Sequence, residues 1–205
     1  MEHGGGFPGR AAAFPRPTRK QVIAIGASTG GTEAIATVMR ALPAGLPCIV
    51  VVQHMPGAFT GMFADRLNAA CAFPVREARN ADRIEPGVAL VAPGGYHLRV
   101  ARSPEGLGLS VAPGAKVSGH CPSVDVMFRS VAVNVGANAI GVILTGMGSD
   151  GAAGLLEMRR AGAGTIGQDE ATSVIYGMPK AAYDKGAVAF QLPIGQVACK
   201  ILSML

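Results

Sequence analysis

Short, uninterrupted apolar runs alternate with helical stretches along most of this chain, and this alternation constrains its fold more than any other feature. Strand-like runs lie at 21–26, 47–53, 139–144, 164–168 and 188–191. Helical stretches lie at 32–41, 58–70, 124–135 and 179–184, and after Asp150 and Pro193. Strands that are apolar on both faces are typical of parallel sheets covered by helices on each side. We therefore expect an α/β fold with a doubly wound, mainly parallel sheet, helices on both faces, and a short antiparallel hairpin inserted between 88 and 111.

The first 20 residues differ in composition from the rest of the chain. They are rich in glycine, proline and arginine, which is typical of disordered linkers. The remaining residues are numerous enough to form one domain, and with 49% hydrophobic residues overall the chain can bury a substantial core. The sequence thus predicts a disordered tail or linker at 1–20 and one folded domain at 21–205.

The charge of the chain argues against nucleic acid as a partner. The formal net charge is +5, but residues 1–20 supply +3 of it, so the predicted domain is nearly balanced. No basic stripe is interleaved with aromatic residues, as nucleic-acid-binding domains require. No apolar stretch approaches the length of about 18 residues that spans a membrane, and the N-terminus lacks the apolar segment of a signal peptide. We expect a cytoplasmic protein without membrane insertion.

A serine follows the first apolar run on the glycine-flanked turn 26–31, Gly-Ala-Ser-Thr-Gly-Gly. This is the G-x-S-x-G arrangement of a nucleophile elbow, a sharp, strained turn that exposes the serine oxygen to a substrate carbonyl. A dinucleotide fingerprint would need glycine in place of Ser28 and an acidic residue about 20 positions later, where 46–54 has no carboxylate. A P-loop would need lysine after the last glycine, where this chain has threonine. The turn therefore favours covalent catalysis by Ser28.

Two further polar residues follow strand-like runs, His54 after 47–53 and Asp150 after 139–144. Because ligands bind at the carboxyl edge of a parallel sheet, we expect Ser28, His54 and Asp150 to meet there as a Ser-His-Asp triad. Simpler explanations exist for two of them: a histidine can merely end a strand, and Asp150 can cap the helix that follows it. The order Ser, His, Asp excludes an α/β-hydrolase, in which the acid precedes the histidine.

The other histidines and the cysteines carry weaker signals. His97 and His120 lie in the irregular middle section, and His120 can line a substrate cleft, although we expect it at the surface. The four cysteines are widely scattered without the spacing of metal ligands, which favours reduced, mostly buried thiols.

Seven motifs, in this order along the chain, resemble those of the chemotaxis protein-glutamate methylesterase family, in its catalytic domain. They are IGASTGG at 25–31, VQHMP at 52–56, APGG at 92–95, PSVD at 122–125, ILTGMGSDG at 143–151, QDE at 168–170 and GMP at 177–179. The resemblance runs from about Gln21 to the C-terminus. It implies a serine hydrolase that removes methyl esters from glutamates on the cytoplasmic methylation helices of chemoreceptors, releases methanol, and deamidates particular receptor glutamines.

Residue by residue, the resemblance implies that Ser28 is the nucleophile, His54 the general base and Asp150 its orienting partner. It also implies that the backbone amides of Thr29 and Met147 form the oxyanion hole, and that no metal or organic cofactor takes part. The physics agrees for Thr29, since an amide beside the nucleophile at a helix N-terminus is aimed at the developing negative charge.

Two features depart from the family pattern. Members typically carry a receiver domain ahead of the catalytic domain, and 20 residues are too few to form one. We therefore expect a stand-alone esterase, or the catalytic half of a longer parent, served by a receiver domain in trans or in that parent. Cys121 stands where the family commonly has arginine. A small-molecule carboxylesterase with the same triad is the main alternative; a catalytically idle adaptor is less favoured, because it would not need all three triad residues.

Overall fold

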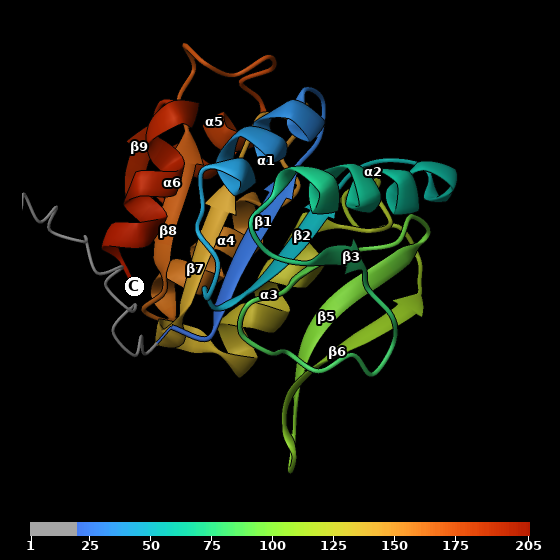
Figure 1. Ribbon diagram of the computed structural model, residues 1–205. Coiled ribbons are helices and arrows are strands. Elements are labelled where there is room, and N and C mark those ends of the chain that lie inside the picture. Colours follow the sequence, from blue (N-terminus) through green and yellow to red (C-terminus); the bar gives the residue numbers. More distant parts are fainter. Residues whose placement is uncertain (1–19) are drawn as a thin grey trace, which may run out of the picture.

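The most apolar runs of the sequence form the centre of a seven-stranded parallel sheet in the computed structural model, which describes residues 20–205 (Figure 1). The sheet order is β3-β4-β2-β1-β7-β8-β9, and every neighbouring pair is parallel. The strands are β1 Val22–Ala27, β2 Cys48–Gln53, β3 Val75–Glu77, β4 Ala89–Val91, β7 Ala139–Ile143, β8 Gly164–Gln168 and β9 Phe190–Leu192. The expected doubly wound sheet is thus confirmed. The predicted tail at 1–20 lies outside the described residues, except for Lys20.

Helices cover both faces of the sheet because successive strand residues point to opposite sides. On one face, Ile23 and Ile25 of β1 pack in the core beneath α1 (Gly31–Arg40), α2 (Gly57–Ala70) and α6 (Ile194–Ser203). On the other face, Val22 and Ala24 share a core with α3 (Val124–Asn134), α4 (Ala152–Arg160) and α5 (Met178–Asp184). A short 3-10 helix, Gly136–Asn138, leads from α3 into β7. None of the described helices is both long and apolar enough to cross a membrane.

The irregular middle section contains the expected antiparallel hairpin, formed by β5 (Tyr96–Ser103) and β6 (Gly106–Pro113). It lies against α3, where the Val100 amide donates to Ser130 Oγ at 2.9 Å. Leu98 and Leu109 of the hairpin are buried in the same core as Phe128 of α3. The hairpin therefore extends the α3 side of the molecule rather than the main sheet.

The strand order reverses at β1, which places the ends of three central strands beside one another. Along the chain β1 continues to β2 on one side, and β7 joins it later on the other side. Ser28 directly follows β1, His54 directly follows β2, and Asp150 lies in the loop after β7. Such a switch point is where ligands bind in open α/β sheets.

Candidate active site

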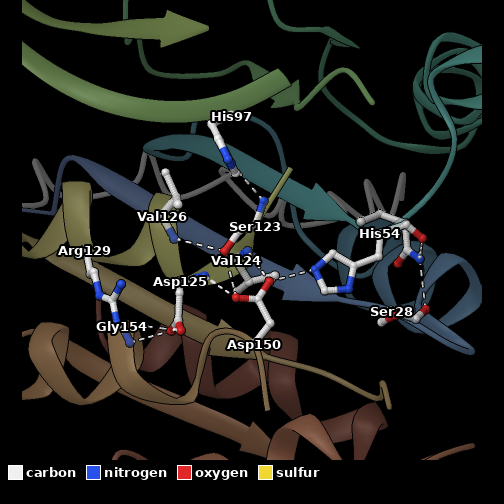
Figure 2. A network of polar contacts seen from close by, with 11 residues as sticks. Ser28, His54, His97, Ser123, Val124, Asp125, Val126, Arg129, Asp150 and Gly154 are labelled. Atoms are coloured by element: carbon white, nitrogen blue, oxygen red, sulfur yellow. Dashed lines mark hydrogen bonds and ion pairs between the residues drawn. The ribbon is translucent and has the colours of Figure 1, made fainter. Parts of the chain in front are cut away.

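His54 and Asp150 form a buried hydrogen-bonded pair at this edge of the sheet (Figure 2). His54 Nε2 lies 2.8 Å from Asp150 Oδ2, and the two side chains are only 6% and 1% exposed. An ionised carboxylate can only accept, so Nε2 donates and Nδ1 is the acceptor nitrogen of the neutral ring. Nδ1 is buried and has no hydrogen-bond partner within residues 20–205. A histidine held in this way is ready to take a proton at Nδ1.

Asp150 owes its position to the N-terminus of α3. Ser123, the N-cap residue, donates from its hydroxyl to Oδ1 at 2.8 Å. The Val124 amide donates to Oδ2 at 2.7 Å, and the Asp125 amide donates to Oδ1 at 3.0 Å. Burial by itself raises the pKa of Asp150, but the hydrogen bonds from His54, Ser123 and the two amides outweigh it and hold the pKa below its ordinary value. The carboxylate is therefore ionised at neutral pH and fixes the histidine tautomer.

Asp150 does not cap the helix that follows it, although local sequence suggests that role. The N-cap residue of α4 is Gly151, and no side chain caps this helix at that position. Instead Asp125, from the first turn of α3, accepts from the Gly154 amide of α4 at 2.7 Å. Asp150, in the loop before α4, thus binds amides in the first turn of α3, and Asp125 of α3 binds an amide in the first turn of α4. Burial raises the pKa of Asp125, and the charge of Asp150 raises it further.

Ser28 sits on a turn that is less strained at the serine than a nucleophile elbow predicts. The Ser28 amide donates to Thr145 O at 3.0 Å, and its carbonyl accepts from the Gly31 amide at 2.7 Å. The left-handed residue of the turn is Gly30, with φ of 78°, whereas Ala81 and Ser118 are the described non-glycine residues with positive φ. A Cβ at Gly30 would lie 2.6 Å from Cβ of Val174, so this position requires glycine for both conformation and space.

Ser28 and His54 line one pocket of about 370 Å³. Its other lining residues are Met55, Lys116, Gly119, His120, Cys121 and Pro122. Within the described chain no hydrogen bond joins the Ser28 hydroxyl to the His54 ring, which is common before substrate binds. The structure therefore brings the three predicted triad residues to one place, with Asp150 behind His54 and Ser28 on the pocket.

His120 lines the pocket, which is the alternative to the surface role expected from the sequence, and it is half-buried. Its ring stacks on that of His54, with centroids 3.7 Å apart and an angle of 8° between the planes. The sequence carried a signal for this placement, because His120 lies three residues before Ser123. Ser123 is the N-cap residue of α3, and the N-terminus of α3 binds the carboxylate of Asp150. The same segment brings Cys121 into the pocket.

The two predicted oxyanion donors lie on loops that are fixed next to Ser28. Thr145 Oγ1 donates to Thr29 O at 3.0 Å, which ties the serine turn to the loop after β7. Gly146 packs so closely that a Cβ there would lie 2.7 Å from Cβ of Ser28. Among residues 20–205, neither the Thr29 amide nor the Met147 amide donates to a protein acceptor. Both amides are thus available to a ligand.

Gln53 is a structural contributor to the site that the sequence reasoning missed. Its side chain is buried, and Nε2 donates to both Ser28 O at 2.9 Å and His54 O at 3.1 Å. It therefore joins the backbone of the proposed nucleophile to that of the proposed base. The available signal was a polar residue at the end of an otherwise apolar strand.

Replacing Gln53 with methionine is expected to lower both stability and turnover. Methionine fills a similar volume but cannot donate, so the His54 carbonyl loses its partner at a cost of about 1–3 kcal/mol in unfolding free energy. Urea denaturation measures this loss, and ester hydrolysis measures turnover. A variant with unchanged stability and turnover would contradict the proposed link.

The cysteines and acidic residues form no evident metal centre. In the described part of the chain, no group of three or more histidine, cysteine, aspartate or glutamate side chains is arranged to hold a metal ion. The four cysteines are unpaired, but the expectation that they are mostly buried is wrong: Cys48 alone is buried, Cys71 and Cys121 are partly exposed, and Cys199 is exposed.

Comparison with known proteins gives a consistent family assignment. The family model described as CheB methylesterase matches residues 23–201. A protein-glutamate methylesterase/protein-glutamine glutaminase of Syntrophotalea carbinolica is 54% identical over 185 residues, 90% of this chain and 52% of the relative. A similarly named protein of Xanthomonas campestris is 54% identical over 197 residues, 96% of this chain and 55% of the relative. The chain therefore spans about half the length of these relatives.

A solved structure is also similar over almost the whole described chain. The crystal structure of the Thermotoga maritima CheB methylesterase catalytic domain superposes with a TM-score of 0.88 at 33% identity, covering 91% of this chain and 99% of that one. The chain belongs to the CheB methylesterase family.

Proposed function

We propose that this chain is a serine hydrolase that removes methyl esters from glutamate side chains of chemoreceptors. The observation that carries the proposal is the pocket in which Ser28 lies beside a histidine already oriented by a buried aspartate. Membership of the CheB methylesterase family supports the substrate class. The names of its relatives also support a second reaction, deamidation of receptor glutamines to glutamates.

In the proposed reaction, Ser28 Oγ attacks the ester carbonyl while its proton passes to His54 Nδ1. Collapse of the tetrahedral intermediate breaks the bond to the methoxy group, which takes the proton from His54 and leaves as methanol. Water then attacks the acyl-serine with the same help from His54 and releases the glutamate carboxylate. Asp150 stays ionised throughout and stabilises the imidazolium. With a glutamine substrate the leaving group is ammonia.

The negative charge of the intermediate needs donors that are free before the substrate arrives. The Thr29 and Met147 amides meet this condition, and the Thr145 and Gly146 contacts hold their loops against Ser28. Loss of one such donor typically costs about 3–4 kcal/mol in the transition state. These two amides are therefore the proposed oxyanion hole.

Exposed apolar side chains near the site support a protein substrate. Met147, in the loop after β7, is 72% exposed. Val174, which packs against the serine turn at Gly30, is 67% exposed. Phe59 and Met62 are also exposed, on α2, which begins three residues after His54. Exposed apolar side chains bind macromolecules where they form one continuous patch. We propose that they contact a cytoplasmic methylation helix of a receptor, which makes the working location cytoplasmic.

Regulation is proposed to come from a receiver domain, either in trans or in a longer parent chain. The support is the length of the relatives, of which this chain spans about half. The catalytic groups all lie within residues 28–150 of this chain, so the proposed hydrolysis itself needs no other domain.

The test is release of labelled methanol from a methylated receptor fragment by the purified chain. We expect methanol in proportion to enzyme, and none when Ser28 is replaced by alanine. Hydrolysis of p-nitrophenyl acetate serves as a control for an intact triad. Normal hydrolysis of that ester without any methanol from the receptor would exclude the receptor assignment and favour a small-molecule esterase.

A further inference from the structure

His120 lies flat against the ring of His54 in the pocket, and neither the triad nor the oxyanion hole uses it. The two ring centroids are 3.7 Å apart and the planes differ by 8°, so the imidazoles are in van der Waals contact over most of their faces. His120 comes from the segment that leads into α3, whereas His54 follows β2. The stack therefore joins two separate parts of the site through the proposed base.

The hydrogen bond to Asp150 does not by itself fix the plane of the His54 ring. One contact, from Nε2 to Oδ2 at 2.8 Å, determines which nitrogen faces the carboxylate but allows the ring to tilt about that contact. Tilting moves Nδ1, the nitrogen on the opposite side of the ring, away from the serine hydroxyl. A parallel ring pressed against one face opposes that tilt. Proton transfer is sensitive to such misplacement, since an error of about 1 Å can cost about 100-fold in rate.

We propose that His120 is a positioning residue that holds the plane of His54, so that Nδ1 remains aimed at Ser28 while the proton is transferred. The inference rests on the proposed function, because it needs His54 to be the base. His120 itself transfers no proton and forms no bond to substrate in this scheme.

His120 must also be neutral when His54 takes up a proton, because two positively charged rings in contact would repel each other. The groups that face it are His54, Asp150 and Lys116, with Cys121 adjacent in the chain. Partial burial lowers the pKa of His120, His54 and Lys116 lower it further, and Asp150 acts in the opposite direction. His120 is therefore neutral at pH 7, and its π face can lie against His54 when that ring becomes positive. Once protonated, it would instead oppose proton uptake by His54.

Two substitutions distinguish the effect of the flat ring of His120 from the effect of its protonation. His120→Ala removes the stack, and we expect kcat for p-nitrophenyl acetate to fall by about tenfold with KM changed less than about twofold. His120→Phe keeps a flat ring of similar size, and we expect it to restore kcat to within about threefold of wild type.

In the wild type, log(kcat/KM) should fall at acidic pH with a slope that steepens from about one towards about two. In His120→Phe the slope should stay near one.

Other results would overturn the inference. Wild-type kcat in His120→Ala would exclude a positioning role, and a His120→Phe variant as slow as His120→Ala would show that the flat ring is not what matters. Circular dichroism and thermal unfolding check that both variants are folded. If the alanine variant is not, a folded His120→Phe variant with a kcat about tenfold below wild type would still overturn the inference. His54→Ala separates this inference from the proposed function: full activity there would refute the triad, whereas an inactive His54→Ala beside a fully active His120→Ala refutes only the role of His120.

Discussion

Replacing Ser28 with alanine is expected to reduce ester hydrolysis by a factor on the order of 10⁵ to 10⁶ and to leave the fold intact. A serine hydrolase without its nucleophile loses the covalent pathway, and only binding and oxyanion stabilisation remain. The Ser28 hydroxyl makes no hydrogen bond within residues 20–205, and the backbone bonds to Thr145 and Gly31 do not involve the side chain. The unfolding free energy should therefore change by no more than about 0.5 kcal/mol.

Methanol release and thermal unfolding measure these two effects on the same preparation. Labelling with a fluorophosphonate provides a third readout, because it reports the activated serine independently of the receptor substrate. The wild type should be labelled and Ser28→Ala should not. Activity in Ser28→Ala above about one hundredth of wild type would contradict the assignment of the nucleophile.

Replacing Asp150 with asparagine is expected to lower turnover by about 10⁴-fold and, unlike the serine substitution, to destabilise the protein. An amide NH₂ at the position of Oδ2 would face two donors, the Val124 amide and His54 Nε2. The histidine would then adopt the wrong tautomer, and buried donors would be left unsatisfied at about 1–3 kcal/mol each. We expect a loss of several kcal/mol in unfolding free energy at pH 7.

The stability difference between wild type and Asp150→Asn should depend on pH in a defined direction. The folded-state pKa of Asp150 is lowered, so its ionised form stabilises the protein at pH values above the unfolded carboxyl pKa of about 3.9. That contribution is lost as the pH falls through the lower folded-state value. The part of the difference in unfolding free energy that comes from the ionised carboxylate should therefore shrink below about pH 4.

Asp184→Asn is a suitable control for this experiment. Asp184 is exposed and pairs with Lys180 one helical turn away at 2.5 Å. Such surface pairs contribute at most about 1 kcal/mol, so the substitution should have little effect on stability and none on turnover. A stability loss for Asp150→Asn no larger than that of Asp184→Asn would contradict the buried network.

The site residues that could be predicted from the sequence are those whose position depends on the local apolar pattern and on the direction of the strands. β1, β2 and β7 are continuous apolar runs, and polar residues that follow parallel strands must gather at one edge. Ser28, His54 and Asp150 could therefore be expected together from the sequence alone. β3 could not be expected, because it has three residues and only Val75 is buried.

The features that escaped prediction depend on contacts between distant parts of the chain. Gln53 and Ser28 are 25 positions apart, and His120 stacks on a residue 66 positions away. The sequence suggested that Asp150 could cap the helix that follows it, but its carboxylate binds the N-terminus of α3 instead. Residue propensities and motif spacing do not predict contacts between residues that are far apart in the sequence.

The structural role of Asp150 at the N-terminus of α3 affects how a protein of this family can lose its activity. Ser28 can be replaced without disturbing a structural contact, whereas Asp150 holds the N-terminus of α3 as well as orienting the histidine. A descendant that became a scaffold or a competitor would thus be free to change its serine while selection for folding still preserved the acid. An aspartate at this position is accordingly poor evidence that a relative is an enzyme, and the serine is the residue to inspect.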